Sequence, residues 1–337
     1  MLLIACASVA GLLGVLGFAV AILGGAHARD ATVQLSLTPQ TAFPKVQSAA
    51  PRFSTQMDAA AGTLTITQPV YAGHALLADP ALIEQTENGP LPRVASDGRT
   101  PMAAYAAPVA AAGKPKIAVV ITGLGISVRQ TDAALSKLPS AVTLAFAPYA
   151  DGAQSLAAEA RKQGHEILAE VPMEPYDFPD SDPGPRTLRA GGDEQANIQR
   201  LAWALTRFTG YTGVVNMAGG RLLSDPDSLS PVMTFLTRRG LLFYDDGSAP
   251  HSIAPEVAHR TGASFAQGTV AIDAVQNPME IDRRLSQLEE QARSTGSASG
   301  TGAVYPVTLD RVALWAQGLS GRGFVLVPAS AIVAKSN

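Results

Sequence analysis

The run Ile117-Ala-Val-Val-Ile121, which leads into Thr122-Gly-Leu-Gly125, decides the fold class of this chain. A continuous apolar run rich in β-branched residues that stops at glycines is typical of a strand buried on both faces of a parallel sheet. A helical pattern over residues 128–138 follows directly. The stretch therefore predicts a strand followed by a helix, which is the repeating unit of α/β folds.

The same order of strand and helix repeats along the rest of the chain. Further strands are predicted at residues 142–146, 166–171, 213–216, 241–244, 270–273 and 324–327. Two helix starts carry capping signals, because Asn277 precedes Pro278 and Thr308 precedes the last apolar helical stripe. Strands that alternate with helices imply a mostly parallel sheet, and about seven units imply a distorted (β/α) barrel, either closed or incomplete.

The first residues form a separate apolar segment. Residues 2–25 contain no charged, amide or proline residue, and a helix of that length reaches about 36 Å, more than a hydrocarbon core of about 30 Å. This predicts a transmembrane helix and a single-pass protein of the inner (cytoplasmic) membrane, with its main domain in the periplasm. A cleaved signal remains the alternative, because Ala26-His27-Ala28 resembles a cleavage site.

Residues 26–113 have a different composition from the predicted barrel. They are rich in proline and alanine, which is typical of a tether. The turn-forming sequence from Gly89 to Arg93 indicates that residues 89–105 are partly packed on the domain. The predicted organisation is thus a helix at 2–25, a tether at 26–113 and a (β/α) domain at 114–333.

Composition excludes several classes of function. The 337 residues include 25 Lys and Arg and 28 Asp and Glu, for a net charge of −3, and no basic run interrupts the chain. Nucleic-acid binding is therefore not expected, because it needs a basic face. The single cysteine, Cys6, excludes an internal disulfide and a cysteine-based zinc site.

Chemistry in such a fold collects at the carboxyl ends of the strands. The catalytic candidates there are Asp245, Glu174 and Glu170, and the substrate-binding candidates are Asn216, Arg221, Asp246, Asp273 and Tyr305. Carboxylates that meet in a cleft repel one another, which raises at least one pKa and makes a general acid or base.

Each of these assignments has a structural alternative. The sequence Asp245-Asp-Gly-Ser248 is also typical of a turn whose side chains accept hydrogen bonds from loop amides. Asp273 is also suited to capping a helix. Arg221 is also suited to neutralising Asp245 in a buried pair.

The chain resembles a known family in several motifs. They are Ile117-Ala-Val-Val-Ile-Thr-Gly-Leu-Gly125, Val142-Thr-Leu-Ala-Phe-Ala-Pro-Tyr149, Gly164-His-Glu-Ile-Leu168, Val171-Pro-Met-Glu-Pro175, Gly213-Val-Val-Asn216, Arg239-Gly-Leu-Leu-Phe-Tyr-Asp-Asp246 and Leu326-Val-Pro-Ala-Ser330. Through these motifs, the region of residues 89–332 resembles the divergent polysaccharide deacetylases, which are relatives of the NodB-homology carbohydrate esterases. The resemblance implies a distorted (β/α) barrel in the cell envelope that removes N-acetyl groups from a polysaccharide, with a divalent metal held by Asp and two His.

The chain departs from that family at the metal-binding positions. Thr122-Gly123 stands where better-equipped members have paired aspartates, and Glu170 stands where His is frequent. The segments 216–219 and 302–306 lack the histidines expected there, and the five histidines fall elsewhere. No metal ligands are therefore assigned and no tightly bound cofactor is expected, although oxygen donors are compatible with weakly held Mg²⁺ or Ca²⁺.

Three functions follow as alternatives. The first is a membrane-anchored domain of deacetylase descent that binds an N-acetylated envelope polysaccharide or peptidoglycan-type glycan with little or no hydrolysis. The second is an active carbohydrate deacetylase with a carboxylate-only site. The third is a non-catalytic scaffold that the helix and tether place beside an envelope-assembly protein.

Overall fold

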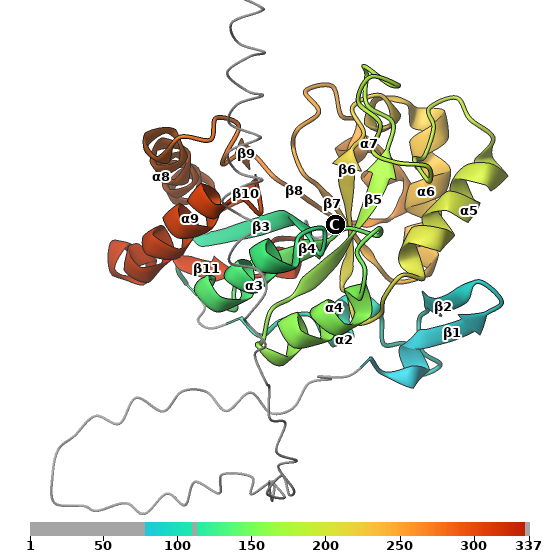
Figure 1. The fold of residues 1–337 in the computed structure, drawn as a ribbon, viewed down its shortest axis with the longest axis horizontal. Helices are drawn as coiled ribbons and strands as arrows, with labels where there is room; N and C mark the ends of the chain where they lie inside the picture. The colour runs from blue at the N-terminus through green and yellow to red at the C-terminus, as the bar shows by residue number, and fades with distance from the viewer. Residues whose placement is uncertain (1–77, 110–112, 334–337) are drawn as a thin grey trace, which may run out of the picture. The chain divides into compact units, whose positions relative to one another are not determined.

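The computed structural model describes residues 78–109 and 113–333, which contain a curled parallel sheet with helices on its outer face (Figure 1). The strands of this sheet are β3 (Lys116–Leu124), β4 (Thr143–Phe146), β5 (Ile167–Met173), β6 (Gly213–Ala218), β7 (Leu242–Asp245), β8 (Ser264–Gln267), β9 (Val270–Ala271), β10 (Ser297–Ala303) and β11 (Val325–Val327). The α-helices are α3 (Val128–Lys137), α4 (Ala153–Lys162), α5 (Glu194–Leu205), α6 (Pro226–Arg238), α7 (Ala254–Thr261), α8 (Pro278–Thr295) and α9 (Pro306–Leu319). The predicted α/β class is confirmed.

The sheet curls until one short segment joins its two edges. Its strand order is β8-β7-β6-β5-β4-β3-β10-β9, and β11 pairs with the first residues of β3. Only Gly268 and Thr269 separate β8 from β9. The amide of Gly268 donates to the carbonyl of Asp245 on β7 (2.8 Å), and the amide of Thr269 donates to the carbonyl of Ser299 on β10 (2.7 Å). The result is a distorted barrel, as the sequence predicts, built on nine strands instead of about seven units.

Strand β10 was not predicted, and its composition explains why. Its sequence Ser-Ala-Ser-Gly-Thr-Gly-Ala has no apolar run, yet it pairs with β3 along its whole length. A Cβ on Gly300 would lie 2.8 Å from Leu288 Cδ1, and one on Gly302 would lie 3.0 Å from Thr308 Cγ2. Small residues are needed here because α8 and α9 approach the sheet closely.

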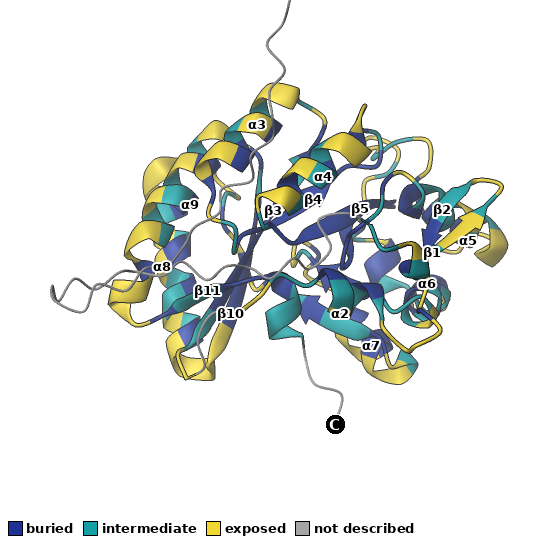
Figure 2. Ribbon diagram, turned by 90° about the horizontal axis from the view of Figure 1, so that it is seen from below, coloured by how far each residue is buried: buried dark blue, intermediate teal, exposed yellow. Residues whose placement is uncertain are grey.

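Alternation along the strands separates two cores. Ile117, Val119 and Ile121 belong to the large core that also contains buried residues of the helices, whereas Val120 belongs to a smaller cluster inside the curl. The other buried members of the inner cluster are Ala145, Leu168, Val215, Leu242, Tyr244, Ala266 and Ala329. Figure 2 shows the strands buried and the outer faces of the helices exposed.

Residues 329–332, near the end of the described chain, pack against the amino ends of the strands. The short helix η4 (Ala329–Ile332) places Ala329 in the inner cluster, and the Ala329 amide donates to Thr143 Oγ1 (2.9 Å). The buried Glu166 accepts the Ser330 amide at 3.0 Å and also the Ser330 hydroxyl. Burial raises the pKa of Glu166, which these hydrogen bonds partly offset.

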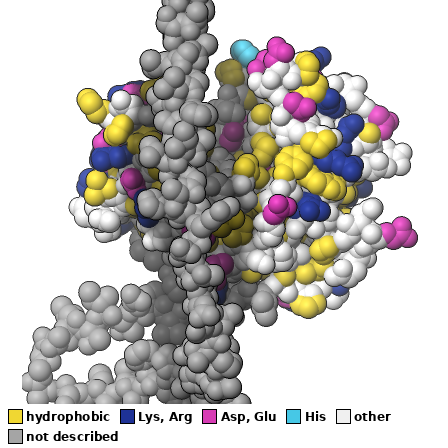
Figure 3. Space-filling view, viewed as in Figure 1, with side chains coloured by type: hydrophobic (Ala, Val, Ile, Leu, Met, Phe, Trp, Pro, Cys, Tyr) yellow, Lys and Arg dark blue, Asp and Glu magenta, His cyan; other side chains and the backbone are white. Residues whose placement is uncertain are grey.

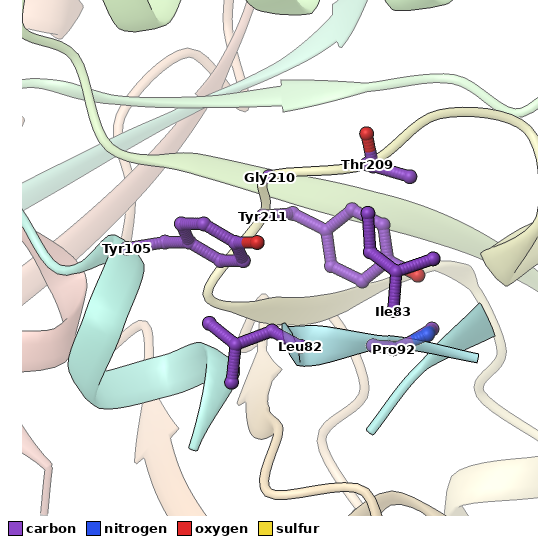
Figure 4. Close-up of a pocket in the computed structure, with 7 residues that line it drawn as sticks. All are labelled: Leu82, Ile83, Pro92, Tyr105, Thr209, Gly210 and Tyr211. Atoms are coloured by element: carbon purple, nitrogen blue, oxygen red, sulfur yellow. The ribbon is translucent and has the colours of Figure 1, made fainter. Parts of the chain in front are cut away.

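Residues 78–109 form a small substructure beside the amino end of β6. It consists of η1 (Pro80–Leu82), the hairpin β1 (Ile83–Thr86) with β2 (Gly89–Pro92), and α2 (Pro101–Tyr105). Figure 4 shows a small apolar cavity where it meets the loop before β6. The cavity is lined by Leu82, Ile83, Pro92, Tyr105, Thr209, Gly210 and Tyr211. Ligand sites in parallel α/β folds lie at the opposite, carboxyl end of the strands, so this cavity is not the candidate site.

Two expectations need correction. The inner-membrane, single-pass assignment is not supported, because no helix within residues 78–109 and 113–333 is both long and apolar enough to cross a membrane. The predicted segment 2–25 itself lies outside the described residues. Thr308 was also expected to cap the last helix, but that helix begins at Pro306 with Tyr305 at its N-cap, and the Thr308 hydroxyl donates to Asp273 instead (2.7 Å). The Asn277 cap is confirmed.

Candidate active site

Glu170 lies inside the carboxyl-end mouth of the barrel. It follows Leu168 by two residues on β5, so alternation directs both side chains to the inner face of the sheet. Strand β4 ends at Phe146, which pairs with Ala169. Glu170 therefore stands one residue beyond the end of its neighbour strand and reaches across to β3.

The Gly123 amide on β3 donates a hydrogen bond to Glu170 Oε1. Gly123 adopts a left-handed conformation with φ of +83°, which residues with a side chain rarely adopt. Thr122-Gly123 stands where better-equipped members of the resembled family have paired aspartates. At this position the chain thus provides a backbone donor instead of a carboxylate. No other described residue hydrogen-bonds to the Glu170 carboxyl group, so Oε2 has no hydrogen-bond partner among them.

Burial controls the charge of Glu170. The residue is 2% exposed, and loss of solvation raises its pKa to about 8, with a further contribution from the negative charge of Asp246. The hydrogen bond from Gly123 opposes this shift but does not cancel it. The carboxyl group is therefore mostly protonated at pH 7 and can donate a proton or a hydrogen bond.

Glu174, just after β5, contacts the loop that contains Ala190 and the loop that contains Arg221. Its Oε2 accepts the Ala190 amide (2.9 Å), and its Oε1 pairs with Arg221 Nη1 (3.1 Å). Its carbonyl also accepts the amides of Arg221 and Leu222 (3.0 and 3.2 Å). The Glu174 side chain is 7% exposed and that of Arg221 is 56% exposed. Arg221 thus neutralises Glu174, not Asp245 as the structural alternative had it.

Asp245 and Asn216 are engaged in holding the turn after β7. Asp245 Oδ1 accepts the Gly247 amide (2.9 Å), and its Oδ2 accepts the Ser252 hydroxyl (2.6 Å). Burial, and to a lesser degree Asp246, raises the pKa of Asp245. Asn216 Oδ1 accepts the Asp246 amide (2.8 Å). These contacts match the turn alternative and bring the ends of β6 and β7 together.

Asp273 and Tyr305 lie on the other side of the barrel, near the end of β10. Asp273 Oδ2 accepts the Ala303 amide at 2.8 Å in addition to the Thr308 hydroxyl. Tyr305 is 39% exposed at the start of α9. No described contact links either residue to Glu174 or Asp245, so the predicted rim divides into two groups.

An open groove of about 230 Å³ lies beside the first group. Its walls are residues 175–177 after β5, 218–220 after β6 and 248–250 after β7. Ala218 has a left-handed φ of +59°, a conformation that costs a non-glycine residue on the order of 1 kcal/mol. Tyr176, 52% exposed, packs on Gly220, where a Cβ would meet its ring at 2.7 Å. Sequence reasoning missed this tyrosine, whose only signal was its place after Pro175.

The side chains at the mouth do not fit a tightly held transition metal. Among the described residues, no three His, Cys, Asp or Glu side chains lie together as a metal site would require. Asp245 already accepts hydrogen bonds through both oxygens. The weakly bound divalent ion stays a prediction.

Comparison with known proteins shows the family of this chain. A family model described as "Divergent polysaccharide deacetylase" matches residues 119–333. The chain belongs to this family. The region that matches the model of the divergent polysaccharide deacetylases includes every strand of the curled sheet, except for the first residues of β3.

Relatives of the chain include uncharacterized proteins from several bacteria. It is 27% identical over 195 residues to the uncharacterized protein YibQ of Escherichia coli K12, a match that covers 58% of this chain and 60% of that protein. A Haemophilus influenzae protein is also 27% identical, over 58% of this chain and 68% of its own. The crystal structure of an uncharacterized Agrobacterium tumefaciens C58 protein has a TM-score of 0.72 and 39% identity, covering 73% of this chain and 100% of that one.

Replacement of Glu174 and of Asp245 should affect stability very differently. Asp245→Ala leaves the Gly247 amide and Ser252 hydroxyl without their acceptor, so we expect a loss of about 3 kcal/mol in the free energy of unfolding. Glu174→Gln keeps an acceptor for Ala190 and loses an ion pair with a half-exposed arginine, so we expect a loss below about 1 kcal/mol. Urea unfolding at pH 7 measures both. Equal losses would contradict this division.

Proposed function

We propose that this chain binds an N-acetylated glycan at the carboxyl end of the barrel, with the neutral Glu170 carboxyl group as the donor to an acetamide. The observation that supports the proposal is the position of Glu170 inside the mouth, where one backbone amide holds Oε1 and no described residue hydrogen-bonds to Oε2. Because Gly123 donates to Oε1, the carboxyl proton belongs on Oε2. An acetamide carbonyl is an acceptor and therefore complements that proton.

The surroundings of Glu170 favour a neutral ligand group over an anion. Asp246 and Asp245 bring negative charge to the same end of the barrel, and the charge of Asp246 raises the pKa of Glu170. A carboxylate ligand at Oε2 would meet this charge, whereas an uncharged acetamide would not. The groove beside the mouth offers the exposed ring of Tyr176 to the apolar face of a sugar.

Calorimetric titration of the full chain with chitohexaose between pH 6 and 9.5 tests the proposal. Binding requires the protonated carboxyl group, so affinity should fall about tenfold per pH unit above a pKa of about 8. Glu170→Gln retains an acceptor for Gly123 and a donor for the ligand, and its affinity should not change with pH. Glu170→Ala should bind at least about tenfold more weakly than Glu170→Gln at every pH. Affinity of the wild type that stays constant to pH 9.5 would contradict the proposal.

The alternative of an active deacetylase is distinguished in the same samples. A carboxyl group that is protonated at pH 7 is also suited to general acid catalysis. If the wild type releases acetate from chitohexaose and Glu170→Gln does not, the chain is an active deacetylase and the proposal of binding without hydrolysis is wrong. The envelope-assembly partner stays a prediction.

A further inference from the structure

A cluster of arginines stacked on aromatic rings covers the side of the barrel between the end of β4 and α5. The guanidinium groups of Arg186 and Arg207 lie 5.6 and 5.3 Å from the ring centre of Trp203. Arg189 lies 3.5 Å above the ring of Phe178. We call Arg186, Arg189 and Arg207 the arginine strip. Figure 3 shows Lys and Arg side chains among hydrophobic ones on this face, at the right of the view.

The arginine strip forms no ion pair within the described part of the chain. None of its three members forms an ion pair with a described carboxylate, whereas Arg221, Arg311 and others do. The polar contacts of their guanidinium groups include one from Arg207 Nε to the Pro148 carbonyl (3.3 Å). A guanidinium group that contacts an aromatic ring can still form bidentate hydrogen bonds to an anion.

The strip is linked to the groove beside the mouth through adjacent residues of the chain. Residues 175–177 line that groove, and the next residue, Phe178, lies under Arg189. Arg189 is itself fixed by Asn197, whose side chain bonds both its amide (2.9 Å) and its carbonyl (2.8 Å). The following residue, Ala190, donates to Glu174 at the end of β5. One ordered segment thus connects the arginines to the candidate site.

We propose that the arginine strip binds carboxylate groups of an acidic N-acetylated glycan whose neutral acetamido groups occupy the mouth. This rests on the proposed function and names the class of glycan. A carboxylate matches the fork geometry of arginine. The stacked ring of Trp203, 5.3 Å from that of Tyr149, adds an aromatic surface of the kind that sugars contact. That combination, with the link to the groove, favours an acidic sugar chain over an acidic peptide.

Binding of three probes to the full chain at pH 6.5 tests the inference. They are neutral chitohexaose, a hyaluronan hexasaccharide that alternates N-acetylglucosamine with glucuronate, and an oligoglutamate peptide. At low salt the hyaluronan hexasaccharide should bind at least about tenfold more tightly than chitohexaose, and added salt should reduce that advantage. The double variant Arg186→Gln/Arg207→Gln should lose the advantage and bind chitohexaose as the wild type does. Arg260→Gln, on α7, is the matched control and should change neither affinity.

The outcomes separate this inference from the proposed function. Equal affinity for both oligosaccharides, or an advantage that survives in the double variant and in Arg189→Gln, would overturn the inference and leave the acetamide site intact. Hyaluronan binding that depends on the arginines but not on Glu170, with no binding of chitohexaose, would support the strip and overturn the proposed function. Oligoglutamate that binds as tightly as the hexasaccharide would overturn the assignment to a glycan.

Discussion

Replacing Glu170 by glutamine is expected to stabilise the protein at alkaline pH, with a gain that grows between about pH 4.5 and 8 and then levels off. In the unfolded chain the carboxyl group ionises near 4.5, whereas in the folded chain its pKa is about 8. The folded state therefore holds a proton that the unfolded state has lost, and wild-type stability falls as pH rises through this window. The slope is about 1.4 kcal/mol per pH unit, which glutamine abolishes.

Urea unfolding at pH 5, 7 and 9 measures this effect. We expect the gain of Glu170→Gln to reach on the order of 3–5 kcal/mol at pH 9 and to be small at pH 5. Glu166→Gln is the matched control at the opposite end of the barrel. Both oxygens of Glu166 accept hydrogen bonds, from Ser330, Thr143 and Ala107, so an amide there loses acceptors and should destabilise at pH 5. A Glu170→Gln difference that is the same at all three pH values would contradict the account.

Replacing Gly247 by alanine should be among the most damaging single substitutions in the barrel. Gly247 has a φ of +75°, and a Cβ there would lie 1.9 Å from the carbonyl oxygen of Gly268. That carbonyl belongs to the segment that joins the two edges of the sheet, so neither backbone can move without disturbing the closure. We expect a loss above about 4 kcal/mol in the free energy of unfolding, or failure to fold.

Gly262→Ala provides the control for backbone strain alone. Gly262 has a similar φ of +67°, and a Cβ there would meet no atom within 4 Å. We expect it to cost only about 1 kcal/mol. Thermal unfolding of both variants separates the clash from the conformational strain. Similar losses at the two positions would show that the contact between Gly247 and Gly268 is not what makes the first position sensitive.

The sequence predicted the elements whose side chains carry a pattern. Strand β3, for example, is an apolar run that stops at glycines and is followed by a helical stripe, so its class and its place in the order followed directly. Strand β10 could not be predicted in the same way, because close packing of α8 and α9 selects Ser, Ala, Thr and Gly there, which resemble a loop composition.

The ion-pair and hydrogen-bond partners of the carboxylates at the candidate site could not be predicted from the sequence either. Position after a strand predicted that Glu170, Glu174 and Asp245 gather at one end of the barrel. It could not show that Arg221 pairs with Glu174, because that choice depends on how two loops cross. The donor to Glu170 is a backbone amide 47 residues away, and a backbone amide leaves no signature in residue type.

Titration of the Glu170 carboxyl carbon by NMR, in the full chain labelled with [¹³C-carboxyl]glutamate, shows whether Glu170 is neutral at pH 7 and binds the glycan in that form. The signal is assigned by its loss in Glu170→Gln, and the titration is repeated with saturating chitohexaose. We expect a midpoint at about pH 8 in the free protein, and a higher midpoint with the ligand, because the ligand binds the protonated form. A midpoint near 4.5, or one near 8 that chitohexaose leaves unchanged, would contradict the account.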